Sequence, residues 1–380
     1  MRIFKLDFVF KHRFWLAFSL LLLSQVLYWF WIRNYTLAYF DENQKDTISW
    51  FSNLVESIYP RLKVEKYRFD AAFFIKKSDQ IAIRFFFIGC IFSLLLLPKV
   101  YQKVKLFVKE KTVYTQKITV RKQYILITYF LVSNVLLSQE WLEILTEYSQ
   151  IADLYEPISF YKIVAPSFPT LPFLTILFYG LRIISIIGVV FFLFSIFSKD
   201  KFLIQKTAFV CLLLSAMLFI YLQGFLYGFG KTEHTYATWN WVCMLLPIWF
   251  WKTNFNTSNL NFVSQNYLVF ISIGLVYASS GLEKIFIGGL EWLNGNALMG
   301  YLELSTTDLG QSLSNYPTLV FLLSIVTIFW EIGFLCIVHK SRKIRLTLIF
   351  IGVCFHVGVY FSMGVGHYLS PWMWVYVFLL

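Results

Sequence analysis

Long apolar runs separated by short polar stretches dominate the 380-residue chain. A helix needs roughly 20 apolar residues to cross a bilayer core about 30 Å thick, and this rule predicts about nine spanning helices, within a range of eight to ten. The predicted spans are 14–32, 81–98, 124–139, 172–198, 207–225, 238–251, 266–282, 319–338 and 346–365. Strand alternation with regular short turns is not evident, so the pattern favours an all-α polytopic membrane bundle over a β-barrel.

Composition excludes a soluble globular protein. Hydrophobic residues make up 58% and charged residues 14% of the chain, against about 45–50% and 25% in soluble domains. The lipid bilayer is therefore the first partner that the sequence implies. The first apolar run follows Arg2, Lys5, Lys11 and Arg13 but is too long for a signal peptide, and no small-residue cleavage site follows it. It predicts an uncleaved anchor.

The net charge of +12 would suggest nucleic acid only if the basic residues formed one accessible face. Instead, twenty of the 33 Lys and Arg residues, with only three acidic residues, fall in alternate connecting segments. These segments are 1–13, 99–123, 199–206, 252–265 and 339–345. Basic loops mark the cytoplasmic side, so we expect a multipass protein of the cytoplasmic (inner) membrane, with a cytoplasmic N-terminus and no nucleic-acid partner.

The longest outer segment, 33–80, is predicted to form a small cap. Ile48, Phe51, Leu54 and Ile58 recur at helical spacing before Pro60, which predicts an interfacial helix. The sequence assigns this cap no function.

Cofactor and metal motifs are not evident. All five cysteines fall inside predicted spans, where free Cys packs as a small hydrophobe, and no Cys/His metal spacing is present. Phosphate-binding, dinucleotide-binding and nucleophile-elbow glycine motifs are also missing. We predict no metal site.

Charged groups inside a bilayer are costly, so each one is a functional hypothesis. The candidates are Arg84, Arg182, His234, Lys284, Glu331 and His356. Arg84 is predicted to snorkel to the headgroups. Three roles stay open for Arg182: snorkelling, pairing with Glu331, or holding an anionic ligand.

Lys284 has the most suggestive surroundings. Tyr277, Gly281 and Lys284 share one helical face, and the small residues 278–281 permit close helix approach. Loss of hydration disfavours a charged ammonium, which would make Lys284 available as a general base. The alternative is an interfacial lysine paired with Glu283 or Glu291, and the residues alone favour this second interpretation.

His356 and Glu331 lie at similar depth on consecutive predicted spans, so we expect the carboxylate to orient the imidazole. A structural hydrogen bond and a catalytic role both stay open for His356. His234 precedes the sixth span on the outer side. Together with Lys284, these groups predict a polar cavity that opens outward.

The ordered set of motifs resembles a known family. The residues that carry this resemblance are Tyr277-Ala-Ser-Ser-Gly281-Leu-Glu283-Lys284, Trp292-Leu-Asn-Gly295, Glu233-His234-Thr-Tyr236, Glu331, Cys354-Phe-His356 and Ser362-Met-Gly364. They are similar to segments of the vitamin K-dependent gamma-carboxylase and its bacterial HTTM (horizontally transferred transmembrane) relatives. The resemblance covers roughly residues 120–380, so we expect a two-span extension over 1–120 and an HTTM-like membrane domain over 121–380.

The resemblance implies that Lys284 deprotonates a quinol such as vitamin K hydroquinone or menaquinol on the outer side. We therefore predict catalytic roles for His234 and His356 beside Lys284, in which the histidines orient groups or relay protons. We predict supporting roles for Glu331, Tyr277, Gly281, Trp292 and Gly295. The resemblance does not extend to the domain with which the carboxylase holds its peptide, so glutamate carboxylation would require a separate peptide-binding partner. Two alternatives stay open: a non-catalytic membrane factor for the maturation or export of a secreted peptide, and a transporter, although no inverted repeat is evident.

Overall fold

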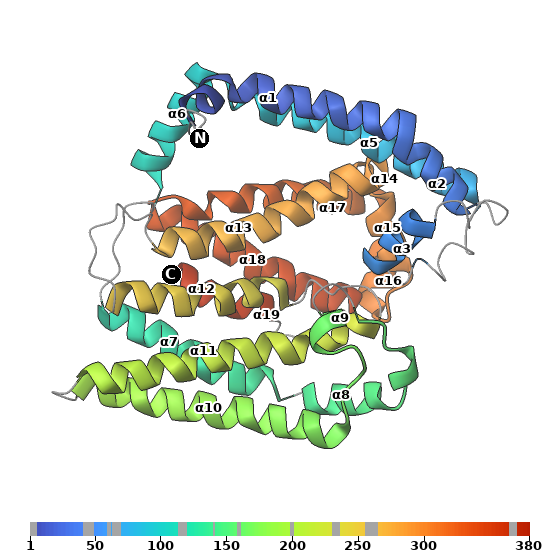
Figure 1. Ribbon diagram of the computed structural model, residues 1–380. Helices are drawn as coiled ribbons and strands as arrows, with labels where there is room; N and C mark the ends of the chain where they lie inside the picture. Colours follow the sequence, from blue (N-terminus) through green and yellow to red (C-terminus); the bar gives the residue numbers. More distant parts are fainter. Residues whose placement is uncertain are drawn as a thin grey trace.

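The computed structural model describes residues 6–40, 49–58, 62, 70–112, 120–139, 141–157, 161–197, 201–229, 236–254, 265–364 and 371–380. The described structure is 89% helical and contains no strand. Among these residues, one isolated antiparallel bridge joins Thr112 and His339. The predicted all-α polytopic bundle is confirmed (Figure 1).

Seven described helices are long and apolar enough to cross a membrane. They are His12–Phe40, Lys122–Ser149, Leu171–Ser195, Leu203–Phe229, Tyr267–Gly288, Pro317–Val338 and Arg342–Met363. An eighth is obtained if α5 (Ala71–Leu94) and α6 (Pro98–Lys111), which meet at a 76° bend, count as one broken span. The remaining predicted span, 238–251, lies in α12 (Ala237–Asn254), which contains Pro247 and does not meet the same criteria.

The N-terminal helices form a pair along one edge of the molecule (Figure 1). α1 (Leu6–Leu27) continues through a π-helical turn, Tyr28–Ile32, into α2 (Arg33–Phe40). α5 packs along this helix, and its first turn is capped by Asp70, whose side chain accepts a hydrogen bond from the Phe73 amide at 2.7 Å. Helical structure therefore extends from both spans into the predicted cap.

The segment between these helices contains α3 (Ser49–Ile58), which is the helix predicted before Pro60. Its strong apolar face follows from the spacing of Phe51, Leu54 and Val55.

The rest of the chain forms the main bundle. Its longer helices are α7 (Val120–Leu137), α10 (Leu171–Phe197), α11 (Lys201–Leu226), α12, α13 (Gln265–Glu283), α17 (Pro317–Gly333) and α18 (Arg342–Met363). The shorter ones are α8 (Trp141–Ser149), α9 (Tyr161–Val164), α14 (Leu290–Leu293), α15 (Asn296–Glu303), α16 (Asp308–Ser314), α19 (Pro371–Trp374) and α20 (Tyr376–Leu379).

A buried hydrogen-bond network fixes the orientation of four of these helices. Trp239 Nε1 donates to Asn134 Oδ1 at 2.9 Å, and Asn134 Nδ2 donates to Ser215 Oγ at 2.9 Å. Ser215 Oγ lies 2.7 Å from Ser185 Oγ. Polar side chains within a bilayer form hydrogen bonds between helices. Rotation of α12, α7, α11 or α10 about its axis would break this network, so the network fixes how the four helices face one another.

The last described segment packs inside the bundle. Val375, Tyr376, Phe378 and Leu379 are buried, and Tyr129 Oη donates to the Trp374 carbonyl at 2.8 Å. α19 and α20 have four residues each, so neither is long enough to cross a bilayer.

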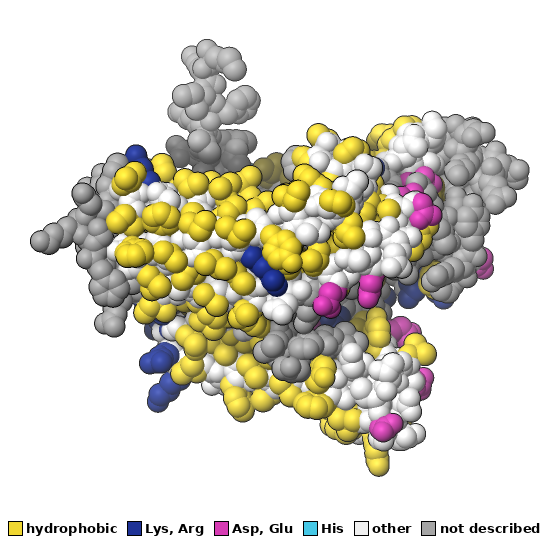
Figure 2. Space-filling model, turned by 90° about the horizontal axis from the view of Figure 1, so that it is seen from below, with side chains coloured by type: hydrophobic (Ala, Val, Ile, Leu, Met, Phe, Trp, Pro, Cys, Tyr) yellow, Lys and Arg dark blue, Asp and Glu magenta, His cyan; other side chains and the backbone are white. Residues whose placement is uncertain are grey.

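Charge is distributed unequally between the two ends of the bundle. Figure 2 shows an apolar band over most of the visible face, with acidic side chains toward the right. The predicted inner segments 99–123 and 339–345 meet, since Lys340 N donates to the Lys111 carbonyl at 2.7 Å. Segments that the charge pattern predicted to share a side are therefore in contact.

Candidate functional site

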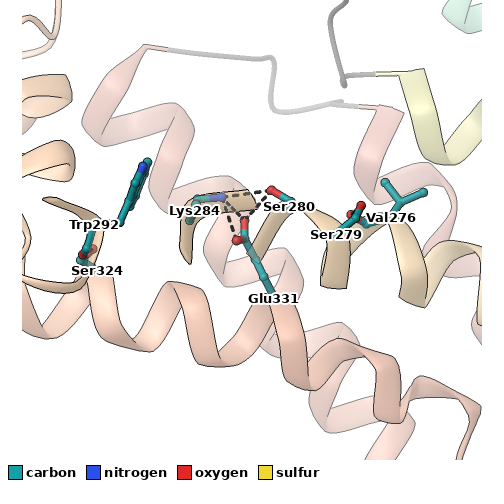
Figure 3. Close-up of polar contacts among 7 residues, drawn as sticks. All are labelled: Val276, Ser279, Ser280, Lys284, Trp292, Ser324 and Glu331. Carbon is teal, nitrogen blue, oxygen red and sulfur yellow. Dashed lines mark hydrogen bonds and ion pairs between the residues drawn. The ribbon is translucent and has the colours of Figure 1, made fainter. Parts of the chain in front are cut away.

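Lys284 forms an ion pair with Glu331 between two spanning helices (Figure 3). Its Nζ lies 2.7 Å from each carboxylate oxygen of Glu331 and donates to Ser280 Oγ at 3.0 Å. Lys284 begins the π-helical turn Lys284–Gly288 that follows α13, whereas Glu331 projects from α17. Ser280 Oγ also donates to Glu331 at 3.3 Å, so three side chains form one network.

Gly281 permits this close approach. A Cβ at position 281 would lie 2.8 Å from Ile332 Cγ1 and 3.0 Å from Glu331 Cβ, which is too close for a side chain. The predicted close helix approach is therefore confirmed at Gly281. It places Ser280 and Lys284, on successive turns, opposite Glu331.

The ion pair is poorly hydrated. The side chains of Lys284 and Glu331 are 17% and 6% exposed. Charges attract more strongly where water is scarce, but removing both from water is costly unless geometry and further hydrogen bonds compensate. The two short contacts and Ser280 supply that compensation, and the Trp292 ring adds a cation–π contact 5.2 Å from Lys284 Nζ.

This pairing corrects the expectation that Glu331 orients His356, and it decides against two pairings that the sequence left open. Lys284 pairs with neither Glu283 nor Glu291, and Glu331 pairs with neither Arg182 nor His356. The direction in which each side chain faces depends on how the helices are rotated about their axes. The spacing within a single run does not fix that rotation.

A second polar cluster is centred on Tyr277. Its Oη lies 2.8 Å from His356 Nε2, on α18, and 2.6 Å from Tyr376 Oη, on α20. Gly352 makes room for Tyr376, because a Cβ there would lie 2.3 Å from the Tyr376 hydroxyl. Tyr376 was not predicted as a site residue, and the aromatic-rich run Trp372 to Tyr376 was the available signal.

Trp330 connects the two clusters. Its ring packs edge-on against Tyr277, with centroids 5.1 Å apart, and its neighbour in the chain is Glu331. Trp330 Nε1 is buried and has no hydrogen-bond partner in the described part of the chain. The Lys284–Glu331 pair and the Tyr277–His356–Tyr376 cluster are thus adjacent along both α13 and α17.

The turn after Lys284 is held by Arg84 from the N-terminal helix pair. Arg84 Nη1 donates to the carbonyls of Phe286 and Ile287, at 2.9 and 3.1 Å. The turn ends at Gly289, whose φ of +60° and ψ of −132° favour glycine. Arg84 therefore supports the turn, whereas its snorkelling to the headgroups stays a prediction.

The predicted Trp-x-x-Gly segment, Trp292 to Gly295, packs against α17. Ser324 Oγ donates to the Trp292 carbonyl at 2.5 Å. Gly295 has a φ of +84°, and a Cβ there would lie 2.9 Å from Phe321 Cα. These contacts fix Trp292 beside Lys284, with α14 and α15 against α17.

The structure thus brings together most predicted site residues. Tyr277 and Gly281 lie on α13, and Lys284 begins the turn that follows it. Trp292 lies on α14, Gly295 precedes α15, and Glu331 lies on α17. His356 joins this group through its contact with Tyr277, and Glu331 through its contact with Lys284. His234 lies outside the described residues. Arg182 lies apart on α10, with its guanidinium 4.3 Å from the Phe178 ring centroid and Nε without a hydrogen-bond partner among the described residues.

The described residues contain no group of three or more His, Cys, Asp or Glu side chains that could hold a metal ion. No family model, curated protein or solved structure matches the chain.

Proposed function

We propose that this integral membrane protein is an HTTM-type enzyme that takes a proton from a membrane-soluble quinol or related lipid at Lys284. The observation that supports the proposal most is the buried Lys284–Glu331 pair between two spanning helices. Ionisable groups inside a bilayer are costly and usually functional. Ser280 and Trp292 position the ammonium within the pair.

The pair could exchange protons as a unit. An amine accepts a proton only when neutral, and Glu331, 2.7 Å away, can hold the proton that leaves the Lys284 ammonium. A substrate hydroxyl would then give its proton to Nζ and restore the ammonium. The products of this step are the substrate oxyanion, the Lys284 ammonium and a protonated Glu331. Glu331 must then release its proton before the next cycle.

The Tyr277 cluster would support this chemistry. Tyr277, His356 and Tyr376 form a hydrogen-bonded chain, and such chains can relay protons or orient a hydroxyl. Tyr277 lies on the same helix as Ser280 and Lys284. We assign His356 a supporting role and Lys284 the role of base.

A quinol fits the residues present. Quinols such as menaquinol or vitamin K hydroquinone supply an ionisable hydroxyl on an apolar ring. The Lys284 side chain keeps 17% exposure, and the Trp292 ring beside it is only partly buried. Trp292 would hold the ring by stacking, and Lys284 would meet the hydroxyl.

The orientation is part of the proposal. With a cytoplasmic N-terminus in a bacterial inner membrane, the Lys284 end of the bundle faces outward. Carboxylation of glutamate would then need a secreted peptide and a soluble partner that presents it.

Purified protein tests this function. We expect wild type to co-purify with a quinone and to consume added vitamin K hydroquinone in air, and Lys284→Met to lose this consumption by at least about 100-fold, as expected for a general base. Lys105→Met, an exposed lysine on α6, is the matched control and should behave as wild type. A folded Lys284→Met protein that kept quinol binding and consumption would refute the base role.

One observation favours a second function. An ammonium has three N–H donors, and the three Lys284 contacts, two to Glu331 and one to Ser280, use them all. A fully satisfied pair suits a purely structural role in a non-catalytic factor for the maturation or export of a secreted peptide. Such a factor would consume no quinol, in either wild type or variant.

A further inference from the structure

A polar cavity of about 240 Å³ lies between the beginning of α5 and the turn that follows Lys284. Its lining combines basic, amide and apolar groups. The residues are Phe73, Lys76, Lys77, Gln80, Arg84, Gly288, Leu290 and Glu291. Neither Lys284 nor Glu331 lines this cavity.

Basic groups outnumber acidic ones in this cavity. Lys76, Lys77 and Arg84 face one carboxylate, that of Glu291, and Glu291 already accepts a hydrogen bond from Asn296 Nδ2 at 3.1 Å. Lys76 is exposed and has no hydrogen bond or ion pair to another described residue. Lys77 Nζ lies 5.9 Å from the Phe73 ring centroid. The lining therefore carries unbalanced positive charge.

Arg84 keeps donors for a ligand. A guanidinium has five N–H donors. Two contacts to backbone carbonyls use Nη1, and one contact to Gln80 Oε1, at 3.4 Å, uses Nη2. Among the described residues, Nε and the second N–H of Nη2 have no acceptor. The contacts with the turn already fix the position of this side chain.

We propose that this cavity binds a phosphate group, and specifically the headgroup of an anionic phospholipid. Arg and Lys are the side chains that recognise phosphate, and basic side chains near a membrane surface are attracted to anionic lipids. Phe73 and Leu290 line the same cavity and are exposed hydrophobic residues, which suits a ligand with acyl chains. The proposal is independent of the function of Lys284.

The site also has a structural consequence. A phosphate on the remaining donors of Arg84 would restrain the guanidinium that holds the Phe286 and Ile287 carbonyls. Bound lipid would therefore stabilise the contact between the N-terminal helix pair and the main bundle.

Native mass spectrometry of delipidated protein in detergent tests the site, with phosphatidylglycerol, phosphatidylcholine and inorganic phosphate as probes. We expect wild type to bind phosphatidylglycerol more tightly than phosphatidylcholine. The double variant Lys76→Gln/Lys77→Gln should bind its first phosphatidylglycerol molecule with at least about tenfold lower affinity. Lys105→Gln/Lys109→Gln removes the same charge from α6, at the other end of the molecule, and should leave that affinity unchanged. Glu291→Gln keeps the acceptor for Asn296 and should strengthen binding.

The outcomes separate the sources of the phosphate. Tight phosphatidylglycerol binding that millimolar inorganic phosphate does not displace supports a lipid headgroup. Displacement by inorganic phosphate supports the same phosphate site with a free anion as its ligand. The proposal is overturned if Lys76→Gln/Lys77→Gln binds phosphatidylglycerol as wild type does, or if the α6 control loses as much affinity.

Discussion

Arg84 donates a hydrogen bond to the carbonyl oxygen of Phe286 at 2.9 Å, although 202 residues separate them in the chain. The contact joins α5 to the turn that follows Lys284. The last carbonyl groups of a helix have no N–H donor within the helix. The Arg84 guanidinium donates to two such carbonyls in the turn. The N-terminal helices are therefore bound to the main bundle at the candidate site.

Arg84→Met should lower the free energy of unfolding by about 1.5–3 kcal/mol, which is typical for hydrogen bonds to a charged group. The midpoint of unfolding in mixed micelles measures this loss. Gln80→Ala removes only the 3.4 Å contact and should cost less. Equal midpoints for Arg84→Met and wild type would show that the contact does not stabilise the protein.

Gly289→Ala should destabilise the protein by about 1–3 kcal/mol, since its backbone conformation is one that side chains rarely adopt. A Cβ there would also lie 2.2 Å from Arg84 Nη2. Gly300 is the matched control, because nothing lies within 4 Å of a Cβ at that position, and an alanine should be neutral or slightly stabilising in α15. Similar unfolding midpoints for the two variants would contradict the proposed strain.

Much of the fold could be predicted from the sequence. Seven of the predicted spans coincide with helices long and apolar enough to cross a bilayer, because roughly 20 apolar residues are needed for that purpose. Pro98 begins α6 after a sharp bend, and a hydropathy pattern that includes residues 81–98 does not show where the direction changes. Residues 371–380 contain no long apolar helix, so their burial inside the bundle could not be predicted.

The sequence identified several residues of the site but not the contacts between them. Lys284, Glu331 and His356 were identifiable, because charge inside a bilayer is costly. Their partners were not, since Glu331 meets Lys284 from a helix 47 residues away and His356 meets Tyr277 from 79 residues away. Such contacts depend on helix rotation, which the network around Asn134 and the small residue Gly281 help to set.

Tyr277→Phe should cost about 1–2 kcal/mol of stability, because it removes the hydroxyl that contacts both His356 and Tyr376. Tyr376→Phe removes only the second of these contacts and should cost less. Tyr301→Phe, at an exposed tyrosine, is the control. Unfolding midpoints for Tyr277→Phe that match those for Tyr301→Phe would show that the cluster adds no stability.

Labelling of single cysteines tests the orientation. The free thiols Cys336 and Cys354 are exposed and would first be replaced by alanine. Glu291→Cys should then react with a membrane-impermeant maleimide in intact cells, and Lys105→Cys only after permeabilisation, because α14 and α6 lie at opposite ends of the molecule (Figure 1). Labelling of both from the same side would contradict the proposed topology.

Lys284→Arg tests the central claim most directly. Arginine can keep a two-point contact with the Glu331 carboxylate but stays protonated, so it separates the structural role of the pair from the role of base. We expect the unfolding midpoint to remain near that of wild type, whereas the rate of vitamin K hydroquinone consumption falls by at least about 100-fold. A Lys284→Arg protein that consumes the hydroquinone at the wild-type rate would contradict the assignment of Lys284 as the proton acceptor.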